Sequence, residues 1–436
     1  MESSKQMTTN QHTLQIGGLF GRINDRQILL NYLIVCYAFV LPISKAATVL
    51  FGMLLILLWS IDGGYAEKLR SIWRCSYIKY LYGLVLLSAI AVLWSSDFGF
   101  WLEFMRKYWH FLIIPVIYTS VRPEYVKPVF SAFLLGMLVS EIVAFGVFFE
   151  VWEYGRATPD NPTPFMDHVN YSIFLALTAL ILLNRIFFEP VMLMRLGYFA
   201  YFLMVTSNLF IIAGRTGQVA FVVGLLLIGF LNIRNRIMAL VIMGLLGSGI
   251  LFGAYTFSDT FKARAGQAVS EVRNMVHHQD FSGSLGQRIS LWVMGTHVFL
   301  ENPIHGTGIG LESTGMSKYV ERYNFTTYAN IEDGVYIDYH NAFVQYAAQL
   351  GIVGLLLFVM IFVSLLRLKF KSRIYFNINM AFVTIYVLLS MGGFSFHLMS
   401  SMTLFVLMSS MLAAISREEN ANGNTAIFLA GTEQLR

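Results

Sequence analysis

The stretch Asp333-Gly-Val-Tyr-Ile-Asp-Tyr-His340-Asn341 leads from a polar segment into an apolar run over residues 341–366. That run is long enough to cross a hydrocarbon core of about 30 Å as one helix. Aspartate is a preferred helix N-cap, so we expect Asp338 to cap this helix and His340 to lie in its first turn. The positive helix end disfavours imidazolium, which leaves a neutral His340 able to accept a proton, although a charged Asp338 would act in the opposite direction. A histidine hydrogen-bonded at the membrane interface is the alternative.

The composition around this stretch is that of a polytopic membrane protein. The chain has 436 residues, 56% hydrophobic and 13% charged, whereas soluble domains carry about 25% charged residues. The first 27 residues are polar and do not resemble a cleavable signal peptide. Basic residues in such a chain report orientation, so the pI near 9.0 does not indicate nucleic-acid binding. Cys36 and Cys75 are expected to be unpaired.

Apolar runs predict an all-α body of about twelve spans, and the turns between some of them are short. We expect tight hairpins at residues 42–45, 214–217 and 232–236. The expected spans are 28–44, 46–61, 78–95, 103–120, 127–151, 169–187, 196–213, 217–233, 237–257, 341–366, 375–394 and 398–415.

Basic residues predict which side each loop faces. With both termini cytoplasmic, the inner segments hold 19 of the 30 Lys and Arg residues and the outer segments hold 11. The chain then divides into a cytoplasmic tail, nine spans, an outer loop, three spans and a second cytoplasmic tail. These parts are residues 1–27, 28–257, 258–340, 341–415 and 416–436.

The outer loop contains helix signals of its own. Residues 261–276 carry apolar side chains at helical spacing and predict a surface helix. Ser284-Leu-Gly-Gln287 matches a capping box, so a second helix should begin at Ser284 and stop at Asn302-Pro303. The loop Gly306-Thr-Gly-Ile-Gly310 is interpreted as a structural turn rather than a phosphate-binding nest. A short helix through Tyr323 and a tyrosine-rich loop over residues 328–339 are expected to follow.

Two arginines are expected on the same side of the membrane as His340. Arg288 follows the capping box, in a first turn that offers free N–H groups to anions. Arg215 lies in Gly214-Arg-Thr-Gly217, where flanking glycines would let the backbone approach a ligand closely. Solvated or headgroup-binding arginines are the alternatives. Together, two permanent cations and one base suit a reaction in which a diphosphate leaves while a hydroxyl attacks.

Other polar residues carry weaker signals. The outer-loop acids form no paired-carboxylate motif, so no metal or other cofactor is expected. His168, in Asp167-His-Val-Asn170, begins a span and is expected either to line the cavity or to belong to a helix cap. Lys45, Arg106 and Lys107 are interpreted as interfacial side chains that snorkel or attract an anionic headgroup. Glu141 is mid-span and is expected to have an interhelical partner or to mark a proton pathway. His305 and His397 carry no assignment.

The motif at His340 resembles that of the O-antigen ligase and polymerase superfamily of bacterial envelopes. There, a histidine and a small polar residue are followed after nine residues by Gly-x-x and a small residue, as in His340-Asn341 and Gly351-Ile-Val-Gly354. The stretch Arg288-Ile-Ser-Leu-Trp292 and the segment Asn302–Gly310 are similar to the family's arginine helix and its glycine-rich segment. Arg215 falls where the family has a second essential arginine.

The resemblance implies a fold and a reaction. It implies a GT-C-like body of the inner membrane, with a site facing the periplasm, that inverts at the sugar without a metal. The donor would be undecaprenyl-diphosphate-linked O-antigen and the acceptor lipid A-core, among membrane lipids and with no nucleic acid. His340 would be the general base, while Arg215 and Arg288 would hold the diphosphate. Substrate contacts are further expected from Asn341, Asp338, His168 and Gln287.

Three alternatives remain open from the sequence. An O-antigen polymerase would use a second lipid-linked glycan as acceptor. A protein O-oligosaccharyltransferase is disfavoured by the short tail after the last span. A lipid-linked glycan transporter would place ionisable residues along a path through the bilayer, whereas the distinctive polar residues here gather at one face.

Overall fold

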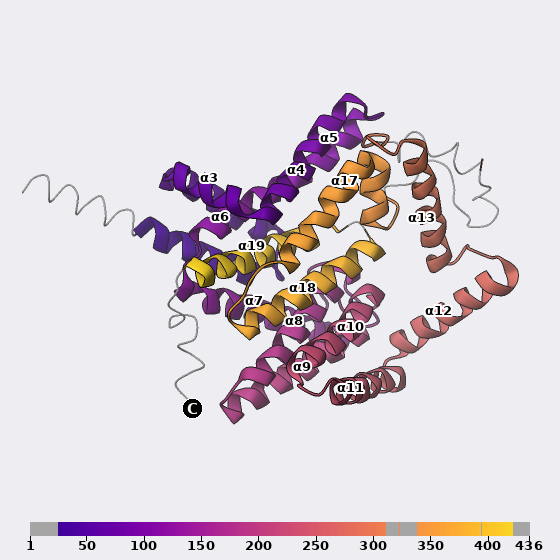
Figure 1. Cartoon of the computed structure of the whole chain (residues 1–436). Helices are drawn as coiled ribbons and strands as arrows, with labels where there is room; N and C mark the ends of the chain where they lie inside the picture. Colours follow the sequence, from indigo (N-terminus) through magenta and orange to yellow (C-terminus); the bar gives the residue numbers. More distant parts are fainter. Residues whose placement is uncertain (1–24, 311–321, 323–337, 394, 422–436) are drawn as a thin grey trace, which may run out of the picture.

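The computed structural model describes residues 25–310, 322, 338–393 and 395–421 (Figure 1). This part is built from helices, and its β pairing is limited to one isolated bridge between Thr158 and Asn161. The helices are α2 (Lys45–Asp62), α3 (Tyr65–Arg74), α4 (Ser76–Ile90), η1 (Ala91–Leu93), α5 (Phe98–Lys107), η2 (Tyr108–Leu112), α6 (Ile113–Ser120), α7 (Pro123–Phe148), α8 (His168–Phe188), α9 (Met192–Ile211), α10 (Arg215–Asn232), α11 (Arg236–Phe257), α12 (Asp259–His278), α13 (Ser284–Glu301), α17 (Ala342–Leu366), α18 (Arg373–Gly392) and α19 (Met399–Ala421).

The all-α polytopic class is confirmed. Within the described residues, ten helices are long and apolar enough to cross a membrane. They are α2, α4 with η1, α7, α8, α9, α10, α11, α17, α18 and α19. Each corresponds to an expected span, and the short turns at residues 42–45, 214–217 and 232–236 join consecutive helices as expected. The other two of the twelve expected spans take different forms.

The expected span over residues 103–120 is divided into α5, η2 and α6. Pro115 explains the break, because it lacks an N–H group and cannot donate to the carbonyl four residues earlier. That carbonyl belongs to Phe111, and it accepts a hydrogen bond from the Tyr82 hydroxyl at 3.1 Å instead. The expected first span is represented, in the described part of the chain, by a helix over residues 25–40.

Helix α19 forms the centre of the bundle. Nearly all of its side chains are buried, and α6, α7, α8 and α18 pack around it (Figure 1). It continues through Ala421, six residues beyond the expected end of the last span at residue 415. The reason is Glu419, a buried carboxylate that accepts from the backbone N–H groups of Lys371 and Ser372 and so ties α19 to the turn before α18.

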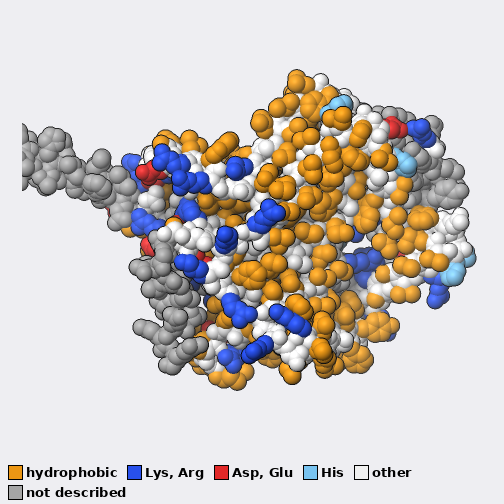
Figure 2. All heavy atoms as spheres, in the orientation of Figure 1, with side chains coloured by type: hydrophobic (Ala, Val, Ile, Leu, Met, Phe, Trp, Pro, Cys, Tyr) orange, Lys and Arg blue, Asp and Glu red, His pale blue; other side chains and the backbone are white. Residues whose placement is uncertain are grey.

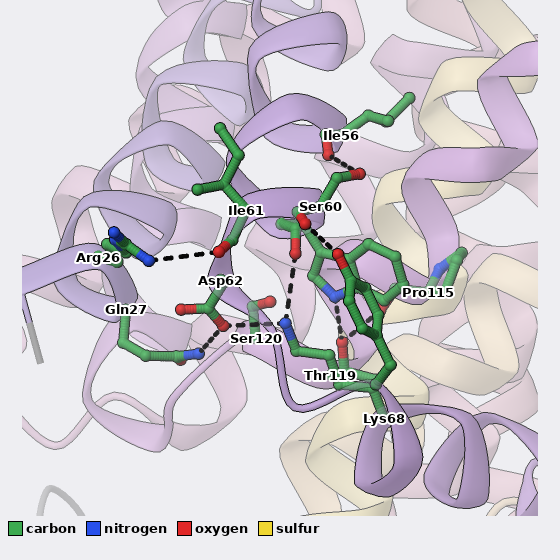
Figure 3. A network of polar contacts seen from close by, with 12 residues as sticks. Arg26, Gln27, Ile56, Ser60, Ile61, Asp62, Lys68, Pro115, Thr119 and Ser120 are labelled. Atoms are coloured by element: carbon green, nitrogen blue, oxygen red, sulfur yellow. Dashed lines mark hydrogen bonds and ion pairs between the residues drawn. The ribbon is translucent and has the colours of Figure 1, made fainter. Parts of the chain in front are cut away.

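A polar network fixes α3 at one end of the bundle (Figure 3). The Asp62 carboxylate lies 2.9 Å from the Lys68 ammonium and accepts from the Gln27 amide at 2.7 Å. Lys68 also lies over the Trp59 ring, whose N–H group donates to Thr119. These contacts join the helix over residues 25–40 to α2, α3 and α6.

Helices α12 and α13 form an arm at the opposite end of the bundle (Figure 1). α12 confirms the surface helix expected over residues 261–276, and α13 begins at Ser284 and ends before Asn302-Pro303 as expected. The capping box is wrong, because the N-cap is Gly283 and no side chain of this segment caps the helix. The Glu271 carboxylate of α12 does so from outside, accepting from the Leu285 N–H at 3.0 Å. The expected features over residues 311–321 and 323–337 lie outside the described residues.

Candidate functional site

The turn between α9 and α10 places Arg215 at the first residue of α10. Its two glycines allow close packing against α8, and their expected role in ligand approach stays a prediction. A Cβ atom on Gly214 would lie 2.3 Å from the Ser172 Cβ, and one on Gly217 would lie 2.3 Å from the Ser172 carbonyl oxygen. The Gly217 N–H also donates to the Ser172 hydroxyl at 3.2 Å. The first turn of α8 therefore fixes the start of α10.

The Arg215 side chain extends from this turn toward α12. Its Nη2 donates to the Gln267 side-chain oxygen at 3.0 Å and to the Arg264 carbonyl oxygen at 3.3 Å. Arg215 and Arg264 also line a pocket of about 370 Å³ whose other walls are mainly apolar. The apolar lining comes from α9, α10, α11 and α12: Phe210, Val219, Val222, Val223, Leu251, Phe261, Ala265 and Ala268. The arrangement places two cations beside an apolar pocket.

Arg288 lies in the same electrostatic environment as Arg215, although 73 positions separate them in the sequence. Its pKa is lowered, first because burial disfavours the charged guanidinium and second because Arg215 is close. The carboxylates of Asp338 and Glu271 act in the opposite direction. Figure 2 shows Lys and Arg side chains in the recess between the bundle and the α12–α13 arm. Two neighbouring cations that are mutually unfavourable form a site that an anion would stabilise.

His340 lies just before α17, not in its first turn. The N-cap is Asn341, whose side-chain oxygen accepts from the N–H groups of Phe343 and Val344, so the expected capping role of Asp338 is wrong. Asp338 instead accepts from the His340 N–H at 2.6 Å, and the same oxygen lies 3.4 Å from Nδ1 of the imidazole. His340 has a φ of 51°, a left-handed conformation that is uncommon outside glycine. Because Nδ1 faces the carboxylate, Nε2 is the nitrogen available to a substrate.

Helix α13 holds this segment in place from the other side. The indole N–H of Trp292 donates to the His340 carbonyl oxygen at 3.3 Å. Tyr339 is fully buried against Gly295, where a Cβ atom would lie 2.8 Å from the tyrosine ring. Arg288 precedes Trp292 by four residues and therefore shares its helix face. One face of α13 thus carries the Arg288 guanidinium and fixes the His340 backbone.

Residues 199–359 match the family model described as O-antigen ligase. This match supports membership of the O-antigen ligase superfamily. A search of curated proteins found no match. The matched segment runs from α9 into α17 and contains Arg215, Arg288 and His340. The resemblance noted in the sequence is therefore confirmed at the level of the superfamily.

The glycines of the superfamily motif shape α17. Gly351 interrupts this helix with φ 66° and ψ −162°, and a Cβ atom there would lie 2.3 Å from the Ile304 carbonyl oxygen. The loop over residues 303–310 fills the opening. The N–H groups of Thr307 and Gly308 donate to α17 carbonyl oxygens at 2.9 Å, and the Ile309 N–H donates to the Ser95 hydroxyl. These N–H groups have partners, which agrees with the interpretation of the loop as a structural turn.

Lys107 and His397 lie near this site but were not assigned to it from the sequence. The Lys107 ammonium is 2.7 Å from Nε2 of His397 and 3.5 Å from the Glu103 carboxylate. Burial and then the Lys107 charge lower the pKa of His397 to about 4, while Asp338 and Glu103 act in the opposite direction. Asp338 therefore lies in the fields of Arg288 and of the Lys107–His397 pair. A histidine in the short turn between the last two spans was the signal available in the sequence.

The remaining assigned residues have other surroundings. His168 begins α8, whose cap is Asp167 as the capping interpretation expects, and its backbone packs on Gly214. The Gln287 N–H donates to the Gly283 carbonyl oxygen at 2.8 Å in the first turn of α13. Glu141 is fully buried in α7, and its carboxylate has no hydrogen-bond partner among the described residues, so the expected interhelical partner is not observed there. His305 is exposed and contacts the Trp94 ring edge-on.

The metal-independent site stays a prediction. In the described ranges no three His, Cys, Asp or Glu side chains gather into a group that could hold an ion. Several outer-loop acids lie outside those ranges: Glu312, Glu321, Glu332 and Asp333.

Proposed function

We propose that the chain transfers a glycan from an undecaprenyl-diphosphate carrier to a sugar hydroxyl of lipid A-core, at the periplasmic face of the inner membrane. Superfamily membership supports glycosyl transfer from a lipid-linked polysaccharide. Two observations carry the proposal: the Arg215 charge acts on Arg288, and Trp292, four residues after Arg288 on α13, donates to the His340 carbonyl oxygen.

In the proposed reaction the acceptor hydroxyl oxygen attacks the anomeric carbon of the donor sugar. Nε2 of His340 takes the hydroxyl proton, and the bond from the anomeric carbon to the diphosphate oxygen breaks with its electron pair. The diphosphate leaves with an additional negative charge, which Arg215 and Arg288 stabilise through charge-assisted hydrogen bonds. Attack from the face opposite the leaving group inverts the anomeric centre.

The apolar pocket beside Arg215 supports a lipid-linked donor. A polyprenyl diphosphate combines a strongly anionic group with an apolar chain. The pocket has two cationic side chains that suit the diphosphate and apolar walls that suit the chain. Arg215 and Arg264 would contact the phosphates, while the walls from α10, α11 and α12 would contact the first isoprene units. A soluble sugar-nucleotide donor would have no use for such walls.

Reconstitution tests the proposal. The purified chain is placed in vesicles with an undecaprenyl-diphosphate glycan and is offered lipid A-core or a second lipid-linked glycan. Transfer to lipid A-core is expected, and His340→Ala is expected to lower the rate by about 10²–10⁴-fold. Arg288→Ala is expected to lower it by a similar factor, whereas Arg273→Ala on the exposed face of α12 serves as a matched control.

Four outcomes would contradict the proposal or part of its mechanism. Transfer to the second lipid-linked glycan alone would identify a polymerase. Glycan flipping without transfer would identify a transporter. Full activity of His340→Ala would show that His340 is not the general base. Loss of transfer on chelation, with recovery when a divalent ion is added, would contradict the metal-independent mechanism.

A further inference from the structure

A second polar cavity lies at the far end of the bundle from His340. It has a volume of about 510 Å³, which falls within the range of small-molecule sites. Its walls come from the start of α4 and from the ends of α3, α6, α17 and α19. His340 lies before the start of α17, whereas the lining residues of α17 belong to its last two turns, from Met360 onward. The cavity is therefore distinct from the proposed transfer site.

The lining of this cavity is strongly basic. Four cationic side chains line it, Arg74, Arg367, Lys369 and Arg417, and no acidic residue belongs to the lining. Arg417 is already paired with Glu418 at 2.6 Å. The other three make no ion pair with an acid among the residues that the structure describes.

The cations are held at defined positions. The Asp62–Lys68 network fixes α3, which ends at Arg74 (Figure 3). The Lys369 carbonyl oxygen accepts from the Ser416 hydroxyl and the Asn420 amide, both at 2.9 Å. These bonds fix the backbone of the turn that follows α17. Figure 2 shows Lys and Arg side chains gathered toward this end of the molecule.

The side chains around the cavity indicate what kind of anion fits. Tyr80, Tyr118 and Ser364 also line it, together with the apolar side chains of Met360 and Ala413. Met360 lies in α17 and Ala413 lies in α19, each before a cationic residue of the lining. Guanidinium groups match the geometry of phosphate oxygens, and apolar lining residues suit the carbon skeleton attached to a phosphate ester.

We propose that this cavity binds a phosphate-bearing ligand through Arg74, Arg367 and Lys369. Two sources share this chemistry: the headgroup of an anionic phospholipid in the adjacent leaflet, and a soluble phosphate compound. The cavity lies at the ends of the candidate spanning helices α4, α17 and α19, where both sources would have access to it.

The test uses the full-length chain in detergent and native mass spectrometry with added phosphatidylglycerol or, in a separate arm, inorganic phosphate. The combined variant Arg74→Gln, Arg367→Gln and Lys369→Gln is expected to bind about tenfold less tightly or worse, because several charge-assisted hydrogen bonds are lost. Ser76 is an exposed residue of the cavity lining, so Ser76→Trp adds bulk there without altering charge and is expected to have the same effect. It also addresses the case in which the triple variant fails to fold.

The control carries Arg70→Gln, Lys127→Gln and Arg234→Gln, three exposed cations outside the cavity lining. It changes the net charge equally and is expected to bind like the unmodified chain. Selective loss of phosphatidylglycerol binding in the cavity variants assigns the lipid headgroup, and selective loss of inorganic phosphate binding assigns the soluble source. Equal weakening in the control, or binding unaffected by Ser76→Trp, would overturn the proposal.

Discussion

The substitution Asp338→Asn isolates the charge next to the proposed base. An asparagine oxygen can still accept from the His340 N–H, so the turn that positions the imidazole is retained. The substitution removes the negative charge of Asp338, which lies 3.4 Å from Nδ1 of His340. The His340 ring would become imidazolium when it takes the acceptor's proton. His340 is 48% exposed, so a water-like dielectric applies and the attraction amounts to about 1.2 kcal/mol.

That magnitude predicts that kcat falls about eightfold in Asp338→Asn. The KM for the lipid-linked donor should not rise, because Asp338 is an anion and its removal does not weaken a diphosphate site. The assay is initial-rate transfer in vesicles at varied donor concentration. Asp280→Asn is the matched control, since Asp280 makes the same kind of contact, to the Ser282 N–H, in an exposed turn. A kcat within twofold of the unmodified chain, or an equal decline in the control, would refute the reasoning.

Further predictions concern the residues that surround the site. His397 has a lowered pKa of about 4, so as the pH falls the unfolded state binds the proton before the folded state does. Between pH 7 and pH 4 the unmodified chain should therefore lose about 3 kcal/mol more of its free energy of unfolding than His397→Asn loses. Thermal unfolding in detergent at both pH values measures this, and parallel pH profiles would contradict it. Gly351→Ala should destabilise by about 1–3 kcal/mol or more, because φ is 66° and a carbonyl oxygen lies 2.3 Å from the new Cβ. Gly244→Ala, with nothing within 4 Å, should not, and equal unfolding midpoints for both variants would be the contrary result. Glu271→Ala should remove the cap of α13 at a cost of about 1 kcal/mol and raise amide exchange around Arg288, whereas unchanged exchange there would show that the cap is dispensable.

The spanning helices could be predicted from the sequence because hydropathy is a local property of each run. The arm helices were also predictable, since α12 repeats apolar residues at helical spacing and Asn302-Pro303 ends α13. The break at Pro115 was visible as a residue, but its consequence depends on the Tyr82 hydroxyl, which takes over the Phe111 carbonyl from another helix. A partner distant in sequence decided that element.

In the site, too, local sequence preference predicts some features and contacts between distant residues decide the others. Asp338 and Asn341 are both good N-cap residues three positions apart, and local preference cannot choose between them. The choice depends on Tyr339, which is buried against α13 and whose N–H donates to the Gln345 side chain at 2.8 Å. With Tyr339 fixed there, the helix begins after Asn341, and Asp338 is left beside His340, where its charge also acts on Arg288. Lys107 and His397 were missed because 290 positions separate them, although their nitrogens are 2.7 Å apart.

The fixed spacing between His340-Asn341 and Gly351 then has a mechanical explanation. Asn341 begins α17 and Gly351 interrupts it, so the intervening residues form one rigid segment held at both ends. At its start, Trp292 of α13 binds the His340 carbonyl oxygen; at its end, the loop after α13 enters the kink through the Ile304 carbonyl. Trp292 of α13 and the loop after α13 therefore contact the two ends of the same segment of α17. An inserted residue between them would rotate one contact by about 100° relative to the other, and would separate the Arg288 face from His340. The spacing therefore sets the distance between the proposed base, His340, and Arg288.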